Sequence, residues 1–378
     1  MKIAVDLRSL SSGSISGVEN YVVNLLEHML PLDRTNSYVL FSNAWSERQV
    51  GEFHFMNSQA RQTSWPNRLL NLALKSGLVR LEQVAGDFDC LFMPNLNQFN
   101  LARDKKLVIT VHDLSPVVTP EFYDVKRNLW HHFLNYRAAF NRADVLLAVS
   151  EYTKRDLVRI YGIPESKIRV VHPGVDRQIF RPDLPLAELR RVRNHYGLPG
   201  EFFLFLNTIE PRKNLTGLIR AFERLAQPIY LVIAGRPGWK YKQALRLIKN
   251  SRKSAKIIYA GYLQEKDKPA VIKLAKALVY PSFYEGFGFQ PLEAMACGTP
   301  VIASQLTSLP EVVGDAGLLI NPYSEDGLLE GMRRLLQEPA LAAALLTKGL
   351  ERVRNFSWQR TAELTLQGIN SLREKQRL

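Results

Sequence analysis

Residues 280–303 read Tyr280-Pro-Ser-Phe-Tyr-Glu-Gly-Phe-Gly-Phe-Gln-Pro-Leu-Glu-Ala-Met-Ala-Cys-Gly-Thr-Pro-Val-Ile-Ala303. The pattern predicts a buried strand, a glycine turn, a helix, a turn of small residues and a second strand. Pro291 suits the first turn of the helix, where its missing N–H costs nothing. A strand that leads through a helix to another strand is the repeating unit of α/β domains.

Two carboxylates flank the glycine turn, Glu285 before it and Glu293 inside the helix, with seven residues between them. They could be two unrelated carboxylates, or the acid/base pair of a glycoside hydrolase. Gly286 and Gly288 instead favour close approach of the backbone to a ligand, and the first turn of a helix attracts anions. The stretch therefore predicts a phosphate site in which Glu293 accepts hydrogen bonds from a ribose diol and Glu285 reaches sugar hydroxyls.

Apolar, strand-like segments alternate with helical patterns nearly throughout, which is typical of parallel sheets. One set of expected strands comprises residues 3–7, 38–41, 91–93, 107–111, 145–149 and 169–171. The other comprises residues 202–206, 229–234, 256–260, 277–280, 301–303 and 317–320. Two such sets predict two doubly wound, Rossmann-like domains facing a cleft, with ligands beyond the carboxyl ends of the strands.

The length of 378 residues is too great for one ordinary core and predicts two domains. Their boundary is expected near the proline-interrupted polar stretch 180–185. The first expected domain spans residues 1–183 and the second spans 184–357. The segment 358–378 has a helical pattern, and we expect it to pack back on the first domain.

Composition excludes several classes of protein. Cys90 and Cys297 are the only cysteines, so we expect neither a disulfide framework nor a metal cluster. The apolar run at the N-terminus is short and interrupted by Asp6, unlike a signal peptide, and no apolar stretch has the length of a membrane span. These features predict a cytoplasmic protein in a reducing compartment.

The net charge of +14 is concentrated in the second half of the chain, most densely over residues 236–276. Such a surface could suit nucleic acid, anionic lipid or a phosphorylated ligand, or be a solvated basic face. Residues 67–85 carry an apolar stripe beside basic residues, and residues 126–142 mix aromatic with basic side chains. Each segment could lie on a membrane or pack in the core.

Arg212 and Lys213 follow the expected strand 202–206 and precede a helix. A planar guanidinium and an ammonium at a helix start suit a phosphate group, although a surface basic pair would have the same sequence. Gly17 belongs to a glycine loop after the first strand. His112 stands beside Asp113 at another strand end, where a structural and a catalytic role are equally compatible with the sequence.

Several motifs are absent or misplaced. The loop 12–20 lacks the dinucleotide fingerprint, and residues 286–291 match it only in part, which disfavours a nicotinamide enzyme. Asp87 and Asp89 mimic a metal-binding pair but precede a strand. Neither zinc spacing, a nucleophile elbow nor a Walker loop is present.

Together these segments resemble the retaining nucleotide-sugar glycosyltransferases of family 4, which have the GT-B fold. The resemblance covers nearly the whole chain, and the two glutamates with seven residues between them are specific in this context. It rests on the loop at Gly17, Val111-His-Asp113, Ala148-Val-Ser-Glu-Tyr152, Val171-His-Pro-Gly-Val-Asp176, Glu210-Pro-Arg-Lys-Asn214, Ile233-Ala-Gly235, Ala260-Gly-Tyr262, residues 281–300 and Leu309-Pro-Glu-Val-Val-Gly-Asp-Ala316.

The resemblance implies roles for residues of the second domain. Arg212 and Lys213 would bind the donor diphosphate, and Glu293 would hold the ribose. Glu285 would hold the donor sugar, together with a glycine-rich turn that consists of Gly286, Phe287, Gly288 and Phe289.

The resemblance also implies roles for four residues outside this group. The N–H of Gly17 would approach the β-phosphate, and His112 would contact sugar or acceptor near the reaction centre. Tyr262 would bind the base, and Gly235 belongs to the same donor site. The usual upstream arginine is replaced by Asn207 and Thr208, which places more weight on Arg212, and the proline after the turn is displaced by one residue.

The resemblance implies transfer of a hexose with retention at the anomeric carbon and without a metal. GDP-mannose is the favoured donor, with a UDP-sugar as the alternative. The implied acceptor is a saccharide or lipid-linked saccharide in cell-surface polysaccharide assembly, including lipopolysaccharide, at the cytosolic face of an anionic membrane. Other hypotheses are a related GT-B enzyme, such as an epimerase or phosphorylase, a catalytically inactive scaffold, and a nucleic-acid-binding module, for which no motif is present.

Overall fold

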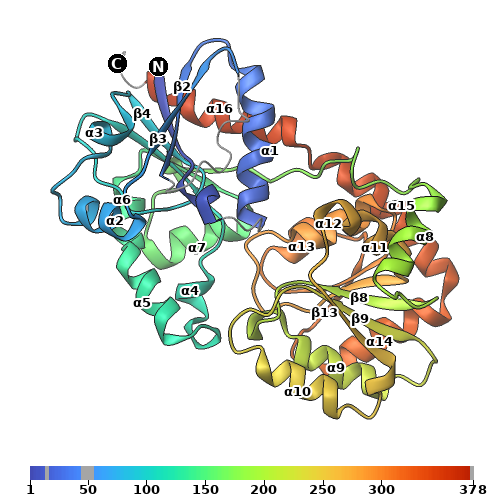
Figure 1. Ribbon diagram of the computed structural model, residues 1–378. Helices are drawn as coiled ribbons and strands as arrows, with labels where there is room; N and C mark the ends of the chain where they lie inside the picture. Colours follow the sequence, from blue (N-terminus) through green and yellow to red (C-terminus); the bar gives the residue numbers. More distant parts are fainter. Residues whose placement is uncertain (13–16, 44–54, 375–378) are drawn as a thin grey trace. The chain divides into compact units, whose positions relative to one another are not determined.

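The computed structural model describes residues 1–12, 17–43 and 55–374 (Figure 1). The chain forms two compact units. The first contains residues 1–114, 129–174 and 358–378, and the second contains residues 115–128 and 175–357. Residues 175–183 therefore pack with the second unit, as does the segment 115–128.

The first unit is built on a parallel sheet with strand order β3-β2-β1-β4-β5-β6-β7. Its strands are β1 (Lys2–Asp6), β2 (Ser37–Asn43), β3 (Ser58–Thr63), β4 (Cys90–Met93), β5 (Lys106–Val111), β6 (Val145–Ala148) and β7 (Ile168–Val170). The strand order reverses between β1 and β4, as in doubly wound folds. All six strands expected here are present. β3 was not expected, because this edge strand is largely exposed and carries no apolar pattern.

The helices of the first unit surround this sheet. They are α1 (Gly17–Leu32), α2 (Asn67–Lys75), α3 (Leu81–Ala85), α6 (Tyr136–Arg142), α7 (Glu151–Tyr161) and α16 (Trp358–Glu374). Helix α5 (Val125–Leu134) begins in the second unit and ends in the first. Helix α16 packs on α1 although more than 300 residues separate them in the chain.

The second unit has a parallel sheet with strand order β10-β9-β8-β11-β12-β13. The strands are β8 (Phe202–Leu206), β9 (Tyr230–Ala234), β10 (Ile257–Gly261), β11 (Ala277–Tyr280), β12 (Val301–Ser304) and β13 (Leu318–Ile320). All six were expected. The helices are α4 (Ser115–Val118), α8 (Leu186–His195), α9 (Leu215–Arg224), α10 (Lys242–Asn250), α11 (Lys268–Leu274), α12 (Phe289–Ala296), α13 (Leu309–Val313), α14 (Glu325–Gln337) and α15 (Pro339–Arg352).

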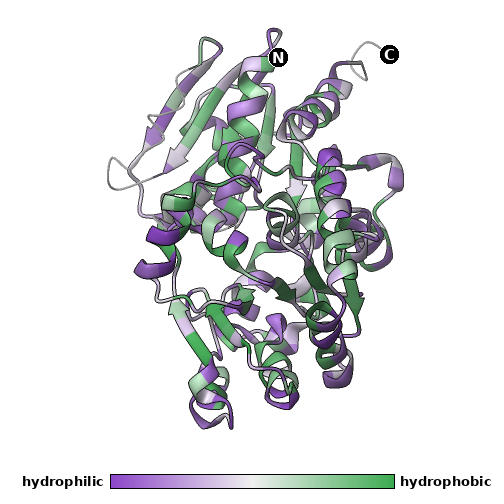
Figure 2. Ribbon diagram, turned by 90° about the vertical axis from the view of Figure 1, so that its right-hand side faces the viewer, coloured by the Kyte–Doolittle hydropathy of each residue, from purple (hydrophilic) through white to green (hydrophobic). Residues whose placement is uncertain are grey.

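The cores lie between the sheets and their helices. In the second unit every residue of β8 is buried, and Leu218, Ile219 and Phe222 of α9 pack against one face of the sheet. Burial of each such large apolar side chain contributes about 2 kcal/mol. Figure 2 shows the strands mainly in the hydrophobic colour, whereas the helices carry hydrophilic stretches. These two parallel sheets confirm the predicted fold class.

Each of the two amphipathic segments has both buried and exposed apolar side chains. In α2, Leu70 and Leu74 are buried, whereas Leu69 and Leu72 are more than half exposed. In the segment 126–142, Phe140 is buried and Trp130 is 43% exposed. None of the helices within the described residues is long and apolar enough to cross a membrane.

Candidate functional site

Arg212 and Lys213 lie in a single 3₁₀ turn, Pro211–Lys213, which follows β8 after a loop of four residues. Asn214 ends this turn in the left-handed conformation, and its side-chain oxygen caps α9 by accepting from Gly217 N at 3.2 Å. Its amide nitrogen donates to Pro322 O at 2.7 Å. The turn is therefore fixed on both sides, which limits the directions in which the two cations point.

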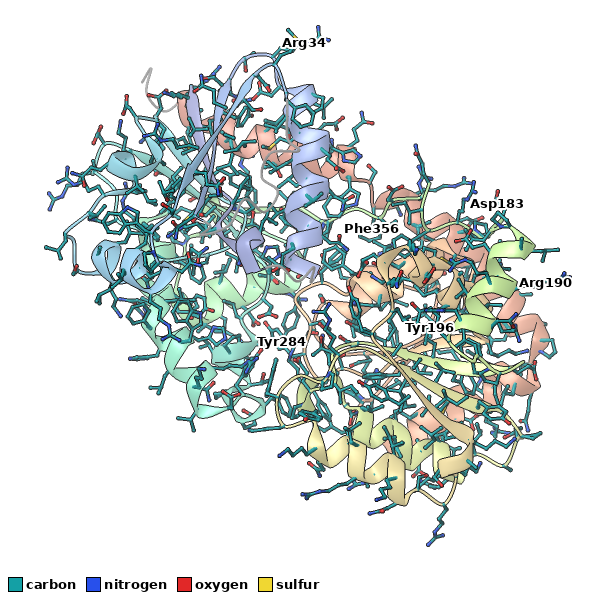
Figure 3. All side chains as sticks on the ribbon, in the orientation of Figure 1. Arg34, Asp183, Arg190, Tyr196, Tyr284 and Phe356 are labelled. Atoms are coloured by element: carbon teal, nitrogen blue, oxygen red, sulfur yellow. The ribbon has the colours of Figure 1, made fainter. Side chains whose placement is uncertain are left out.

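The Arg212 guanidinium is buried among oxygen acceptors. It contacts Glu210 at 2.8 Å, the carbonyl of Tyr284 at 2.7 Å and Glu285 at 3.2 Å. Figure 3 labels Tyr284, which lies in the loop between β11 and α12. Arg212 thus joins the loop after β8 to the loop after β11, at the reversal of strand order where doubly wound sheets bind ligands.

Lys213 binds the same carboxylate, with its Nζ 2.6 Å from Glu285 Oε1. Burial alone would raise the pKa of Glu285, but Lys213 and Arg212 outweigh burial and lower this pKa to about 2. Burial and the neighbouring Arg212 lower the pKa of Lys213. Burial raises the pKa of Glu210. Of the two carboxylates, Glu285 therefore holds its negative charge more firmly.

Helix α13 and the residues before it hold the glycine turn. Glu285 N donates to the Thr307 hydroxyl at 3.0 Å, and the Ser308 hydroxyl donates toward the carbonyls of Glu285 and Phe287 at 2.9 and 2.8 Å. Gly288 has φ of +116° at the start of α12, a conformation that favours glycine. Phe289 follows as the first residue of the helix, and Gly286 completes the turn.

Glu293 lies on α12, buried with 6% exposure. Its Oε1 accepts a hydrogen bond from Lys268 Nζ at 2.8 Å. Its Oε2 is also buried but has no hydrogen-bond partner among the residues that the structure describes. A buried carboxylate oxygen without a donor is an acceptor site for a ligand hydroxyl.

Gly235 and Tyr262 lie at the carboxyl ends of the neighbouring strands β9 and β10. A Cβ built at Gly235 would lie 1.8 Å from the carbonyl oxygen of Asn207, so only glycine fits. The Arg236 guanidinium lies 3.9 Å above the Tyr262 ring, and Tyr262 is 41% exposed. The stacked side chains of Arg236 and Tyr262 therefore form a flat, partly exposed surface.

Gly17 and His112 belong to the first unit. Gly17 is the first residue of α1, and residues 13–16 of the glycine loop, with Gly13, lie outside the described residues. The His112 Nε2 lies 2.8 Å from Pro94 O, and the ring packs edge-on against Tyr21. Burial lowers the pKa of His112, so the imidazole is neutral at pH 7 with its proton on Nε2.

The structure thus brings three predicted residues, Arg212, Lys213 and Glu285, into contact at the carboxyl ends of β8 and β11. Glu293 lies on α12 and contacts Lys268. Sequence reasoning missed two of their partners as site residues. Glu210 stood in a quoted motif but received no role, and Lys268 lay in a run of alternating charges that resembles a solvated face. Within residues 1–12, 17–43 and 55–374, no group of His, Cys, Asp or Glu side chains could hold a metal ion.

Comparison with known proteins identifies the family of this chain. Residues 15–179 match the family model described as Glycosyltransferase Family 4, and residues 190–352 match the model Glycosyl transferases group 1. O-antigen chain mannosyltransferase B of Escherichia coli is 33% identical over 276 residues, which cover 71% of this chain and 70% of the relative. The serotype-specific mannosyltransferase WbdA of E. coli is 32% identical over 71% of this chain, but the match spans only 34% of WbdA.

Solved structures share the fold over the full length. Sucrose-phosphate synthase from Thermosynechococcus elongatus superposes with a TM-score of 0.77 at 21% identity and covers 99% of both chains. Anabaena HepE in complex with UDP and glucose gives a TM-score of 0.75 at 17% identity, over 98% of this chain and 100% of HepE. The chain belongs to the family 4, group 1 glycosyltransferases.

Proposed function

We propose that this glycosyltransferase moves a hexose from a nucleoside-diphosphate sugar to a hydroxyl of a saccharide acceptor, with retention at the anomeric carbon. The observation that carries the proposal is the buried cluster of Arg212, Lys213 and Glu285 after the central strands, in a unit whose helix α12 also carries the half-satisfied carboxylate of Glu293. Two cations at a strand end suit a diphosphate, and Glu293 Oε2 suits a ribose hydroxyl.

Charge supports catalysis at the leaving group. The positive charges of Arg212 and Lys213 are formally balanced by Glu210 and Glu285. A bound donor diphosphate would add negative charge to this neutral cluster and would attract both cations. Fixed cations that stabilise a developing diphosphate charge lower the barrier without a metal. EDTA should then leave turnover unchanged. Loss of activity in EDTA with recovery in Mg²⁺ would refute this part of the proposal.

The state of Glu285 favours front-face attack. A carboxylate with a pKa of about 2 that is held by two cations is a weak base and a weak nucleophile. We therefore assign Glu285 to holding the donor sugar, and the acceptor proton to a donor phosphate oxygen. For the first unit we propose that His112 contacts sugar or acceptor as a neutral hydrogen-bonding group, and that the N–H of Gly17 contacts the β-phosphate.

The favoured donor is GDP-mannose, because relatives with about one-third identity are E. coli O-antigen mannosyltransferases. The alternative is a UDP-sugar, since HepE has been solved with UDP and with UDP-glucose. A thermal-shift screen with GDP, UDP, ADP and dTDP separates these donors. At a hundred times its Kd a ligand adds about 2.7 kcal/mol, which is roughly 5–10 °C for a unit of this size.

For the acceptor we propose a lipid-linked saccharide that the protein meets as a peripheral protein at an anionic membrane. The surface that supports this proposal is the exposed side of α2, with Leu69, Leu72, Arg68 and Lys75. Nearby in the first unit, Lys75 Nζ lies 3.4 Å above the ring of Phe133 on α5. Leu72→Asp should weaken binding to anionic vesicles several-fold, whereas equal binding to neutral and anionic vesicles by both proteins would refute the proposal.

The direct test of the site is Lys213→Ala. Loss of a cation at the leaving group should lower kcat by about 10²–10³-fold. Lys348→Ala is the matched control, because Lys348 forms an exposed pair with Asp315 in the same unit. Near wild-type turnover of a folded Lys213→Ala protein would show that the phosphate assignment is wrong.

A further inference from the structure

Glu293 forms a buried ion pair with Lys268 through Oε1, the oxygen that is not proposed to bind ligand. Lys268 is 9% exposed, and its Nζ donates to Glu293 Oε1 at 2.8 Å. Glu265 is a second, more distant carboxylate at 3.8 Å, and Lys268 Nζ lies 5.5 Å from the centre of the Phe180 ring. The four-carbon side chain of Lys268 is therefore largely enclosed, and its ammonium lies closest to one oxygen of Glu293.

The backbone at Lys268 is anchored by a separate network. Lys268 is the first residue of α11, and Asp267 precedes it. Asp267 accepts hydrogen bonds from Arg191 on α8 and from the hydroxyl of Tyr196, whose oxygen also accepts from Gln264 N at 3.1 Å. Figure 3 labels Tyr196. Helix α8 thus fixes the start of α11, and with it the origin of the Lys268 side chain.

The charges explain why this position needs a cation. Burial raises the pKa of Glu293, and Lys268 opposes that shift. The ammonium of Lys268 donates a hydrogen bond to Oε1, and Oε2 has no donor among the described residues. An unpaired buried carboxylate oxygen costs about 1–3 kcal/mol, which a ligand hydroxyl that donates to Oε2 would offset.

We propose that Lys268 is a positioning residue for ribose recognition, which holds Oε1 of Glu293 so that Oε2 accepts a hydrogen bond from a ribose hydroxyl of the donor. The inference rests on the proposed binding of a nucleoside diphosphate in this unit. Lys268 would act only through Glu293, by keeping Oε2 oriented toward the ribose. A purely structural ion pair would stabilise α11 against α12 and leave ribose discrimination unchanged.

The test compares ribose with its dideoxy form. Calorimetry gives the Kd of GDP, UDP and their 2′,3′-dideoxy counterparts for the wild type and for Lys268→Met. We expect the wild type to prefer the ribonucleotide by about 10–100-fold, as for a hydrogen bond to a charged group. In Lys268→Met the ribonucleotide should bind at least about tenfold more weakly and the dideoxynucleotide nearly as before, so the preference falls toward one.

Additional variants separate positioning from folding. Lys268→Arg should retain most of the preference for the ribonucleotide. Because Lys268 acts through Glu293, the double variant Lys268→Met/Glu293→Gln should show no smaller preference than Glu293→Gln alone. Lys268→Gln should also lower the preference if Lys268→Met does not fold. Lys348→Met is the control and should keep wild-type values.

Two outcomes would overturn the proposal in different ways. An equal loss of affinity for both nucleotide forms, or an unchanged preference in every folded Lys268 variant, would make Lys268 structural and leave the proposed function intact. Failure of the wild type to bind GDP and UDP in either form would remove the proposed function, and this inference with it.

Discussion

Replacement of Lys213 by methionine tests the charge balance of the site through stability as well as activity. The variant keeps the apolar side chain but removes the ammonium 2.6 Å from Glu285 Oε1. Glu285 then retains Arg212 as its cationic partner, at 3.2 Å. We expect the variant to be less stable at neutral pH, because a buried carboxylate loses its shorter ion pair.

The magnitude follows from the pKa of Glu285. A decrease from 4.5 in the unfolded chain to about 2 in the folded protein corresponds to about 3 kcal/mol of stability. Because the folded pKa is the lower one, this stability is present above about pH 4.5 and is lost as the pH falls toward 2. Arg212 preserves part of it, and burial lowers the pKa of Lys213, which offsets another part, so Lys213→Met should cost about 2 kcal/mol at pH 7.

Thermal denaturation measures this cost. For the second unit, about 2 kcal/mol should lower Tm by roughly 4–8 °C at pH 7, and the difference between wild type and variant should shrink below pH 4. Lys348→Met, at an exposed pair, should leave Tm unchanged at both pH values. A Tm difference that is the same at pH 7 and pH 3 would refute the assignment of the cost to the Lys213–Glu285 pair.

Three further predictions concern packing and titration. Gly235→Ala should cost roughly 3 kcal/mol or more in urea denaturation, whereas Gly200→Ala, with no atom within 4 Å of the new Cβ, should cost less than about 0.5 kcal/mol. Cys90 and Cys297 are buried, and burial raises the pKa of the Cys297 thiol to about 12, so both should react with a thiol reagent only after unfolding; fast reaction of the native protein would contradict this. Burial would raise the pKa of Asp33, but the hydrogen bonds it accepts lower it, so Asp33→Ala should destabilise the first unit by about 3 kcal/mol at pH 7, and by less as the pH falls below 3.8; a cost independent of pH would point to packing instead.

The regular elements were readable from the sequence because buried parallel strands are continuous apolar runs. The sequence of β8, Phe-Phe-Leu-Phe-Leu, is a short apolar run between two polar segments and therefore predicts a buried strand. β3 has the sequence Ser-Gln-Ala-Arg-Gln-Thr and lies at the sheet edge, where backbone pairing with β2 specifies it rather than burial. Side-chain patterns carry no information about such a strand.

The candidate site divides in the same way. The positions of Arg212, Lys213 and Glu285 were predictable because each lies in a loop after a strand, and such loops converge in any parallel sheet. Glu293 lies inside α12, where the sequence pattern also placed it. Their pairing was not predictable. The Arg212 contact with Glu210 and the Lys213 contact with Glu285 depend on distances between loops, which residue spacing does not give.

The sequence by itself determined two parallel-sheet units and the chemical types present at the edge of the second sheet. Hydrophobic periodicity and the glycine turn at 286–288 suffice for that, because both act over a few residues. Only the tertiary structure decided that Glu285 is held by two cations, and that Lys268 binds one oxygen of Glu293 while the other has no donor among the described residues. Burial and charge pairing between segments far apart in the chain set these states, and both arise only when the sheets and helices pack.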